Sequence, residues 1–269
     1  MKLVEVVSTI STAPDVAGKV ELLRAQLRDQ LEGHVDQLDI TPLGVAAVDP
    51  ASQWEATVAI RVIATARHRE PLLHFAPAVG SLYLQGFPGF HHDGHAPRAT
   101  EPWPRMDCWP ALLPAELLDH HVVLDDGSRL DVPEPSRTAT PEQLAHAEAH
   151  GPAPDGPLIE LGDLAYARAG DKGGNSNVGV WVPDPAHWDW LRATLSTERV
   201  KQLLPEAAGR IVRHEFPHLR AVHLVLTGLL GSGGSSTLRV DQIGKSVGEY
   251  LRAKHVPGPR SPRGHLRSG

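Results

Sequence analysis

The stretch that decides the fold of the second half is A-R-A-G-D-K-G-G-N-S-N-V-G-V, residues 167–180. Its glycines permit a positive φ or a close approach of the backbone to a neighbour: Gly170, Gly173 and Gly174. Arg168 and Lys172 are suited to holding an anion, and Asp171 is suited to orienting a cation or exchanging a proton. Two interpretations stay open, a ligand-binding loop or a hairpin turn whose glycines serve backbone geometry alone.

Apolar segments on both sides of this stretch predict an α+β second half. A strand at about 158–169 leads into the stretch, and V-G-V-W-V (178–182) continues from it as a second strand. Further predicted elements are a helix over 188–204, strands over 211–216 and 221–228, and a helix over 242–254. A second glycine-rich segment, residues 228–241, lies between the last strand and the last helix.

Each glycine-rich segment follows a predicted strand, so both can lie at one end of a sheet and form an anion cradle. The catalytic candidates are Asp171 and Lys172. The ligand-binding candidates are Arg168, Gly170, Gly173, Gly174, Asn175, Asn177, Gly233, Gly234, Ser235, Ser236 and Arg239, with Lys245 beside them. The alternative is that Arg239 and Asp241 form a surface pair and the glycines only shape turns.

The first half shows the order strand, helix, strand, strand, helix. Residues 3–9 and the alternating A-T-V-A-I-R-V-I-A-T-A (56–66) predict strands, and residues 35–43 predict another. Helices are predicted over 70–85 and where apolar residues recur at spacings of three and four: Val16, Val20, Leu23, Leu27 and Leu31. The order favours a ferredoxin-like split β-α-β sandwich, so we expect two sheet-plus-helix halves of the α+β class.

Proline content indicates how these halves are joined. We expect a first domain over 1–132, with an ordered Pro/Trp/His-rich loop at 86–115 and a hairpin at 120–132. Residues 133–157 lose apolar periodicity and predict a linker, which holds a short helix at 142–150. The second domain then covers 158–256, and a disordered tail follows over 257–269.

Composition excludes several classes of protein. A net charge of −6 disfavours a nucleic-acid-binding surface, and no apolar run approaches the length that spans a membrane. The single cysteine, Cys108, excludes an intramolecular disulfide and a cysteine-based zinc site. We therefore expect a cytoplasmic homo-oligomer that binds neither nucleic acid nor membrane.

Familiar catalytic motifs fail at particular residues. Gly244-Lys245-Ser246 ends like a P-loop, but position 239 is arginine where that motif needs glycine. A dinucleotide fingerprint beginning at Gly231 would need glycine in place of Ser236, and Ser176 lacks the closing glycine of a nucleophile elbow. Histidines cluster at 91–95 and 146–150 without a known ligand spacing, so we expect no metal.

Three ordered motifs resemble the C-terminal domain of the acyclic terpene utilisation (AtuA-type) family: R-A-G-D-K-G-G-N-S-N-V-G-V, R-H-E-F-P-H-L-R-A-V-H-L-V-L and L-L-G-S-G-G-S-S-T-L-R-V-D-Q-I-G-K. That similarity covers about 158–256. Residues 54–132 more loosely resemble the end of the family's N-terminal region. The resemblance implies a ferredoxin-like domain, a context of bacterial breakdown of citronellol- and geraniol-type acids through CoA thioesters, and a large α/β portion that this chain lacks.

Three hypotheses follow from the residues and the resemblance. The first is an enzyme or enzyme subunit acting on an acyl-CoA or a branched or terpenoid carboxylic acid, by hydration, dehydration or carbon–carbon lysis. In it Asp171 is the acid–base group, and Lys172 and Arg168 stabilise an enolate or thioester oxygen. The second is a non-catalytic assembly module that partners a separate α/β chain. The third is a tailoring enzyme of secondary metabolism. CoA is expected only as part of a substrate, and no other cofactor is assigned.

Overall fold

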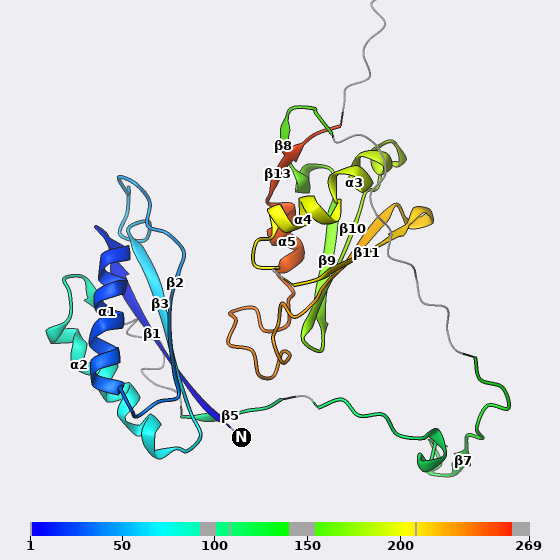
Figure 1. Cartoon of the computed structure of the whole chain (residues 1–269), viewed down its shortest axis with the longest axis horizontal. Coiled ribbons are helices and arrows are strands. Elements are labelled where there is room, and N and C mark those ends of the chain that lie inside the picture. The colour runs from blue at the N-terminus through cyan, green and yellow to red at the C-terminus, as the bar shows by residue number, and fades with distance from the viewer. Residues whose placement is uncertain (1, 92–100, 108, 140–153, 208, 260–269) are drawn as a thin grey trace, which may run out of the picture. The chain divides into compact units, whose positions relative to one another are not determined.

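The computed structural model describes residues 2–91, 101–107, 109–139, 154–207 and 209–259. The chain divides into two compact units, Met1–Met106 and Asp107–Gly269, and each contains an antiparallel sheet with helices (Figure 1). The predicted α+β class is confirmed. The finer predicted domain limits stay a prediction, and the helix expected at 142–150 lies outside the described residues.

The first unit is a split β-α-β sandwich. Its elements are β1 (Lys2–Thr12), α1 (Val16–Leu31), β2 (Gln37–Leu43), β3 (Thr57–Ala66), the 3-10 helix η1 (Glu70–His74), α2 (Phe75–Gln85), β4 (Phe90–His91) and β5 (Trp103–Arg105). The strand order is β2-β3-β1-β4, and β5 also pairs with β1. Both helices bury their apolar faces in the core that lines this sheet.

Capping, glycine and proline residues explain where α1 begins and ends and where α2 begins. In α1 the Asp15 side chain accepts a hydrogen bond from the Gly18 N–H, which caps the helix. Gly33 adopts a φ of +75° just beyond the last turn, as an αL residue after a helix does. The second predicted helix, 70–85, is divided into η1 and α2. Pro77 has no N–H to donate to the preceding turn, so the α-helix starts at Phe75, with Pro77 in its first turn.

The proline-rich segment 86–115 has two kinds of aromatic residue. Phe87 and Phe90 are buried in the core of the first unit, whereas Trp103 and Trp109 are exposed. Residues 92–100 and Cys108 lie outside the described part of the chain. The hairpin predicted at 120–132 is present as β6 (His121–Val123) and β7 (Arg129–Asp131), with a short 3-10 helix, η2 (Ala115–Leu117), before it.

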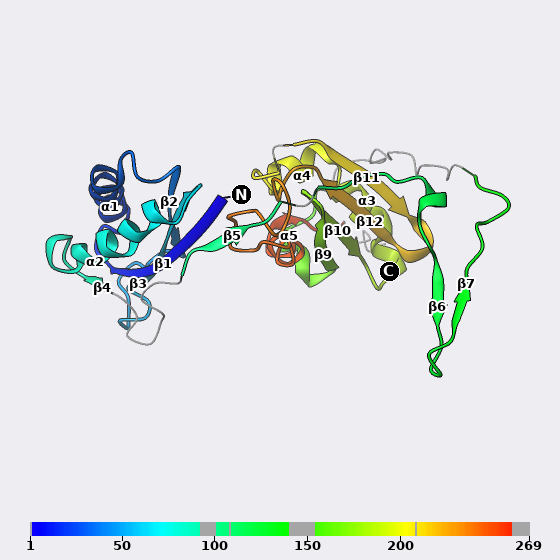
Figure 2. The same ribbon diagram turned by 90° about the horizontal axis from the view of Figure 1, so that it is seen from below.

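The second unit contains the stretch 167–180. Its elements are β8 (Leu158–Glu160), η3 (Leu161–Asp163), β9 (Tyr166–Lys172), β10 (Asn175–Trp181), η4 (Pro185–His187), α3 (Trp188–Thr194), α4 (Thr197–Leu203), β11 (Ile211–Phe216), η5 (Pro217–Leu219), β12 (Ala221–Leu226), α5 (Val247–Arg252) and β13 (His255–Pro257). The main sheet has the order β11-β12-β10-β9 (Figure 2), and β8 pairs separately with β13 (Figure 1).

Three predicted boundaries in this unit were wrong. The strand expected at 158–169 is interrupted by η3, where a reciprocal capping box between Glu160 and Asp163 holds a tight turn. The segment expected to be one helix over 188–204 forms two helices. Ser196 caps the N-terminus of α4, so a new helix starts there and α3 stops at Thr194. The last helix begins at Val247 rather than 242. Residues 242–246 instead form a turn around the Asp241 carboxylate, which accepts from two backbone N–H groups.

The two sheets share one topology. In the first unit the strands β1, β2, β3 and β4 occupy the places that β10, β11, β12 and β9 occupy in the second. The difference is sequence order: β4 follows α2, whereas β9 precedes β10 and joins it by a tight turn. The second unit is therefore a circular permutation of the same split β-α-β arrangement, and this places the glycine-rich hairpin at one edge of the sheet.

The strands of the second sheet alternate between two faces, as the pleat of a β-strand requires. Val178, Val180, Val222 and Leu224 are buried and pack with the helices in the core. We call the other side the open face. The residues on the open face are partly or largely exposed. They are Tyr166, Arg168, Gly170, Lys172, Asn175, Asn177, Gly179, Trp181, Val212, His214, Phe216, Ala221, His223 and Val225.

Candidate functional site

The stretch 167–180 folds as the hairpin of β9 and β10. Lys172 pairs with Asn175, so the turn consists of Gly173 and Gly174 alone. Gly173 has a φ of +59°, as glycine does at the first position of some two-residue hairpin turns. Of the two interpretations left open by the sequence, the hairpin turn is therefore present, and any ligand must bind to its strands or its end.

The second glycine-rich segment packs on this hairpin end. The Leu230 N–H donates to the Gly174 carbonyl at 2.9 Å, and the Gly228 N–H donates to the Asn175 Oδ1 at 2.9 Å. A Cβ at Gly174 would lie 2.0 Å from the Gly231 oxygen, so only glycine permits this approach. Several of these glycines therefore serve the contact between the two segments.

Two lysines lie at this end of the sheet. Lys172 is exposed, and its Nζ donates to the Asp171 carbonyl at 3.2 Å. Lys245 is also exposed, and its Nζ lies 2.8 Å from where a Cβ on Gly170 would stand. Gly170 therefore leaves room for the Lys245 ammonium beside β9, and the hairpin end has the positive charge that an anion needs.

Asp241 fixes the backbone at Lys245. Its carboxylate accepts from the N–H of Lys245 at 3.0 Å and from the N–H and hydroxyl of Ser246 at 2.6 Å each. Burial acts to raise the pKa of Asp241, but these hydrogen bonds outweigh it and hold the pKa below its ordinary value. Asp241 therefore stays ionised and orders the turn from which Lys245 extends.

The two catalytic candidates project to opposite faces of β9. Asp171 lies opposite Ser176 on the helix side of the sheet. Lys172 lies on the open face, the same face as Arg168. The Ser176 hydroxyl is buried and has no hydrogen-bond partner among the described residues. Because β9 is an edge strand, a ligand can reach both Asp171 and Lys172 only by bending around that edge.

Arg239 and the serines do not join this cluster of charges. The Arg239 Nη2 lies 2.5 Å from the Glu206 Oε2, in an ion pair beside a small pocket lined by Leu204, Leu226 and Tyr250. Ser235 is exposed, and Ser236 is buried with its hydroxyl 3.4 Å from the Gly233 carbonyl. The alternative pairing of Arg239 with Asp241 was wrong, since each has another partner. Gly233 and Gly234 shape the loop, Gly233 with a φ of +115°.

Arg168, on the edge strand β9, and Asn177, on β10, belong instead to the open face. The strand register places Arg168 and His223 on either side of Gly179, with Trp181 two residues along β10. Sequence reasoning missed His223, Trp181 and Gly179 as neighbours of Arg168. The alternation of β9 and β10 could have assigned their faces, but only the pairing of β10 with β12 brings His223 beside Gly179.

The surroundings of His223 on the open face lower its pKa. Burial lowers its pKa below the ordinary histidine value, and the nearby His214, whose ring centroid is 6.0 Å away, lowers the pKa further. The unfolded chain therefore binds a proton at His223 at a higher pH than the folded chain does.

We expect stability to fall as the pH drops from above 6.5 toward the lower folded pKa, because protonation favours the unfolded state in that window. His223→Gln should lose less of its stability between pH 7.5 and pH 5.5 than the wild type loses. Urea denaturation of both proteins at the two pH values measures the difference. An equal loss in both proteins would contradict the assignment.

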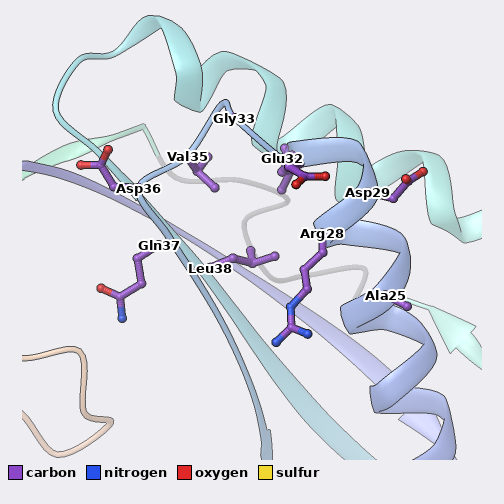
Figure 3. Close-up of a pocket in the computed structure, with 10 residues that line it drawn as sticks. Ala25, Arg28, Asp29, Glu32, Gly33, Val35, Asp36, Gln37 and Leu38 are labelled. Carbon is purple, nitrogen blue, oxygen red and sulfur yellow. The ribbon is translucent and has the colours of Figure 1, made fainter.

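The first unit has a groove of its own, of about 630 Å³, between the end of α1 and β2. Figure 3 shows the Arg28 side chain extending from α1 toward Leu38, with Asp29 directed away from it. Arg28, Asp29, Glu32 and Asp36 line the groove together with apolar residues, so its charges are mixed. None of the sequence candidates lies here.

The described residues hold neither a metal-binding cluster nor a helix that could span a membrane. No group of three or more His, Cys, Asp and Glu side chains within the described ranges is arranged to hold a metal ion. His92, Asp93, His95, His146, Glu148 and His150 lie outside those ranges. Among the helices that the structure describes, none has the length and apolar character needed to cross a bilayer.

Comparison with known families gives two matches that together cover most of the chain. The model of the AtuA ferredoxin-like domain matches residues 159–257, the part of the chain enclosed by the paired strands β8 and β13. The model of the acyclic terpene utilisation family protein AtuA matches residues 5–124. The curated proteins and the solved structures give no significant match. The chain belongs to the acyclic terpene utilisation (AtuA-type) family, and its second unit is that family's ferredoxin-like domain.

Proposed function

We propose that the chain is an enzyme, or a subunit of one, that acts on an acyl-CoA or a branched or terpenoid carboxylic acid. The main support is the contact of the two glycine-rich segments at the hairpin end, with Lys172 and Lys245 exposed beside it. Family membership supports a context of terpene utilisation. In this proposal the two lysines hold the phosphates of CoA or a carboxylate.

The proposed chemistry is hydration, dehydration or carbon–carbon lysis next to the activated carbonyl. Lys172 is the proposed stabiliser of an enolate or thioester oxygen, because it is a cation at an accessible strand end. Asp171 is the proposed acid–base group for a substrate that bends around the edge of β9, since it occupies the other face of that strand. Arg168 belongs to a separate part of the same sheet.

Removal of the Lys172 charge is expected to weaken acyl-CoA binding at least tenfold, because an exposed phosphate-binding lysine acts mainly through its charge. Isothermal titration of the wild type and Lys172→Ala with CoA, acetyl-CoA and isovaleryl-CoA measures the effect. The free energy of unfolding should change by less than about 1 kcal/mol, as expected at exposed positions.

Two further variants sharpen this test. Lys201→Ala removes an exposed lysine of α4 that pairs with Glu198, and it should leave binding unchanged. Arg239→Ala should weaken binding less than Lys172→Ala, because Glu206 already balances that guanidinium. If the wild type does not bind CoA at millimolar concentration, the proposal is contradicted.

A second candidate function, assembly with another chain, is favoured by one observation. Residues 109–132 expose many large apolar side chains, including Trp109 at 90% and Leu112 at 100%, along with Leu117 and Val123. Exposed large apolar side chains concentrated in one segment are typical of protein–protein contacts. Light scattering of the wild type and of a Trp109→Ser, Leu112→Ser variant tests it. The variant should have a lower mass if the segment joins subunits, and an unchanged mass would reject self-association through these residues.

A further inference from the structure

Charge is sorted between the two faces of the second sheet. The acidic residues of its strands, Asp171 and Glu215, project to the helix side, whereas Arg168 and Lys172 project to the open face. None of the side chains that β9, β10, β11 and β12 present to the open face is acidic. Arg168 has no ion-pair partner among the residues that the structure describes. The open face therefore has an uncompensated positive charge on its edge strand β9.

Gly179 leaves open space beside that charge, because it has no side chain. Gly179 stands between Arg168 on β9 and His223 on β12, its direct partners in the two ladders. The nearest atom to a Cβ built on Gly179 is the Arg168 carbonyl oxygen, 4.0 Å away, so the space above this glycine is unfilled. The backbones of β9 and β12 are about 10 Å apart, because β10 lies between them. A carboxylate can therefore lie over Gly179 between the Arg168 and His223 side chains.

Aromatic rings lie on both sides of Gly179 along the open face. The rings of Trp181 and Tyr166 stack at 5.9 Å on one side of Gly179, and Phe216 packs edge-on against the His223 ring at 6.4 Å. On the other side the Asn177 Oδ1 is buried without a hydrogen-bond donor among the described residues. Aromatic rings beside the Arg168 guanidinium complement a flat apolar group that carries a negative charge.

We propose that the open face binds a small carboxylate with a flat apolar body, whose carboxylate lies over Gly179 between Arg168 and His223. Arg168 is suited to a two-point contact with a carboxylate, and a ring N–H of His223 can donate to the same group. The apolar body then lies on Trp181. This site goes beyond the proposed function, since it needs neither CoA nor the lysines of the hairpin end.

Benzoate is the probe, since it joins a carboxylate to a flat apolar ring. Isothermal titration of the full chain with benzoate at pH 7 should give a dissociation constant on the order of 1 mM, as expected for so small a ligand. Benzamide, a neutral analogue of similar shape, should bind at least tenfold more weakly. Equal binding of benzoate and benzamide would overturn the proposal, because the cation would then have no role.

Two variants locate the site. Arg168→Gln should weaken benzoate binding at least tenfold, while Lys201→Gln, on the helix side, should not change it. Gly179→Val should abolish detectable binding and keep or raise the melting temperature, because valine suits a strand and a Cβ there meets open space. Benzoate binding that is unchanged in both Arg168→Gln and Gly179→Val would overturn the proposal. So would a wild-type dimer that Gly179→Val dissociates and that binds no benzoate, since a second copy would then cover this face.

Discussion

Glu215→Ala is expected to lower the free energy of unfolding of the second unit by about 3 kcal/mol, the typical cost of removing one partner from a buried ion pair. Glu215 Oε1 accepts from the Arg213 Nη2 at 2.7 Å, and its Oε2 accepts from the Arg192 Nη2 at 2.6 Å. The Arg213 side chain is fully buried, and that of Glu215 is only 10% exposed. Without the carboxylate, a buried guanidinium charge stays uncompensated.

The same network ties α3 to the sheet. Arg213 also donates to the carbonyls of Leu195 and Arg192 at the end of α3, at 2.7 and 3.0 Å. Burial acts to raise the pKa of Glu215, but its hydrogen bonds with Arg192 and Arg213 outweigh this and lower the pKa. The stabilisation by Glu215 is therefore present above pH 4.5, the ordinary pKa of a glutamate. It is lost as the pH falls through the lower pKa of Glu215 in the folded protein.

Urea denaturation at pH 7, followed by the fluorescence of the buried Trp190, measures the loss. Glu198→Ala is the matched control, because its pair with Lys201 is exposed and should change stability by less than about 0.5 kcal/mol. Wild type and Glu215→Ala should approach each other in stability at acidic pH. A Glu215→Ala protein as stable as Glu198→Ala at pH 7 would show that the network contributes little.

Gly174→Ala is expected to cost about 2 kcal/mol, because it overpacks the contact between the two glycine-rich segments. The added Cβ would lie 2.0 Å from the Gly231 carbonyl oxygen, a backbone atom that no side-chain rotation can move. The loop must then separate from the hairpin end, which removes the hydrogen bond from the Leu230 N–H to the Gly174 carbonyl. Leu230 is fully buried, so its packing is disturbed too.

The readout that isolates this effect is hydrogen exchange at the Leu230 amide. Exchange should accelerate in Gly174→Ala, because that amide loses its acceptor. Gly173→Ala is the matched control at the neighbouring position. A Cβ there has no neighbour within 4 Å, so its cost of about 1 kcal/mol comes from its φ of +59° alone. Unchanged Leu230 exchange in Gly174→Ala would contradict a tight contact between the segments.

Periodic segments were predictable because burial on one face repeats with a fixed period. The apolar residues of α1 at spacings of three and four are buried as expected: Val20, Leu23, Leu27 and Leu31. The alternating strand 56–66 and the hairpin at Asp126-Gly127 also form where their patterns predict. The boundaries failed where a local polar contact overrode the pattern, as at Ser196 and Asp241.

The candidate site was predictable only in part, because small residues give no facial pattern. Along β9 the sequence Y-A-R-A-G-D-K does not indicate which side is covered, since alanine and glycine suit both faces. The buried Arg213 was equally hidden, because a charged residue in a strand is ordinarily exposed. Its burial depends on acceptors supplied by α3 and by Glu215.

By itself the sequence determined the α+β class with two ferredoxin-like halves, because hydrophobic period and turn chemistry are local properties of the chain. It left the stretch 167–180 open between a hairpin turn and a ligand-binding loop, and the structure shows the hairpin. The tertiary structure decided which charges meet. The pairing of β10 with β12 sets His223 beside Gly179, opposite Arg168. His223 lies more than 40 residues from Gly179 in the sequence, so no local pattern contains this neighbour.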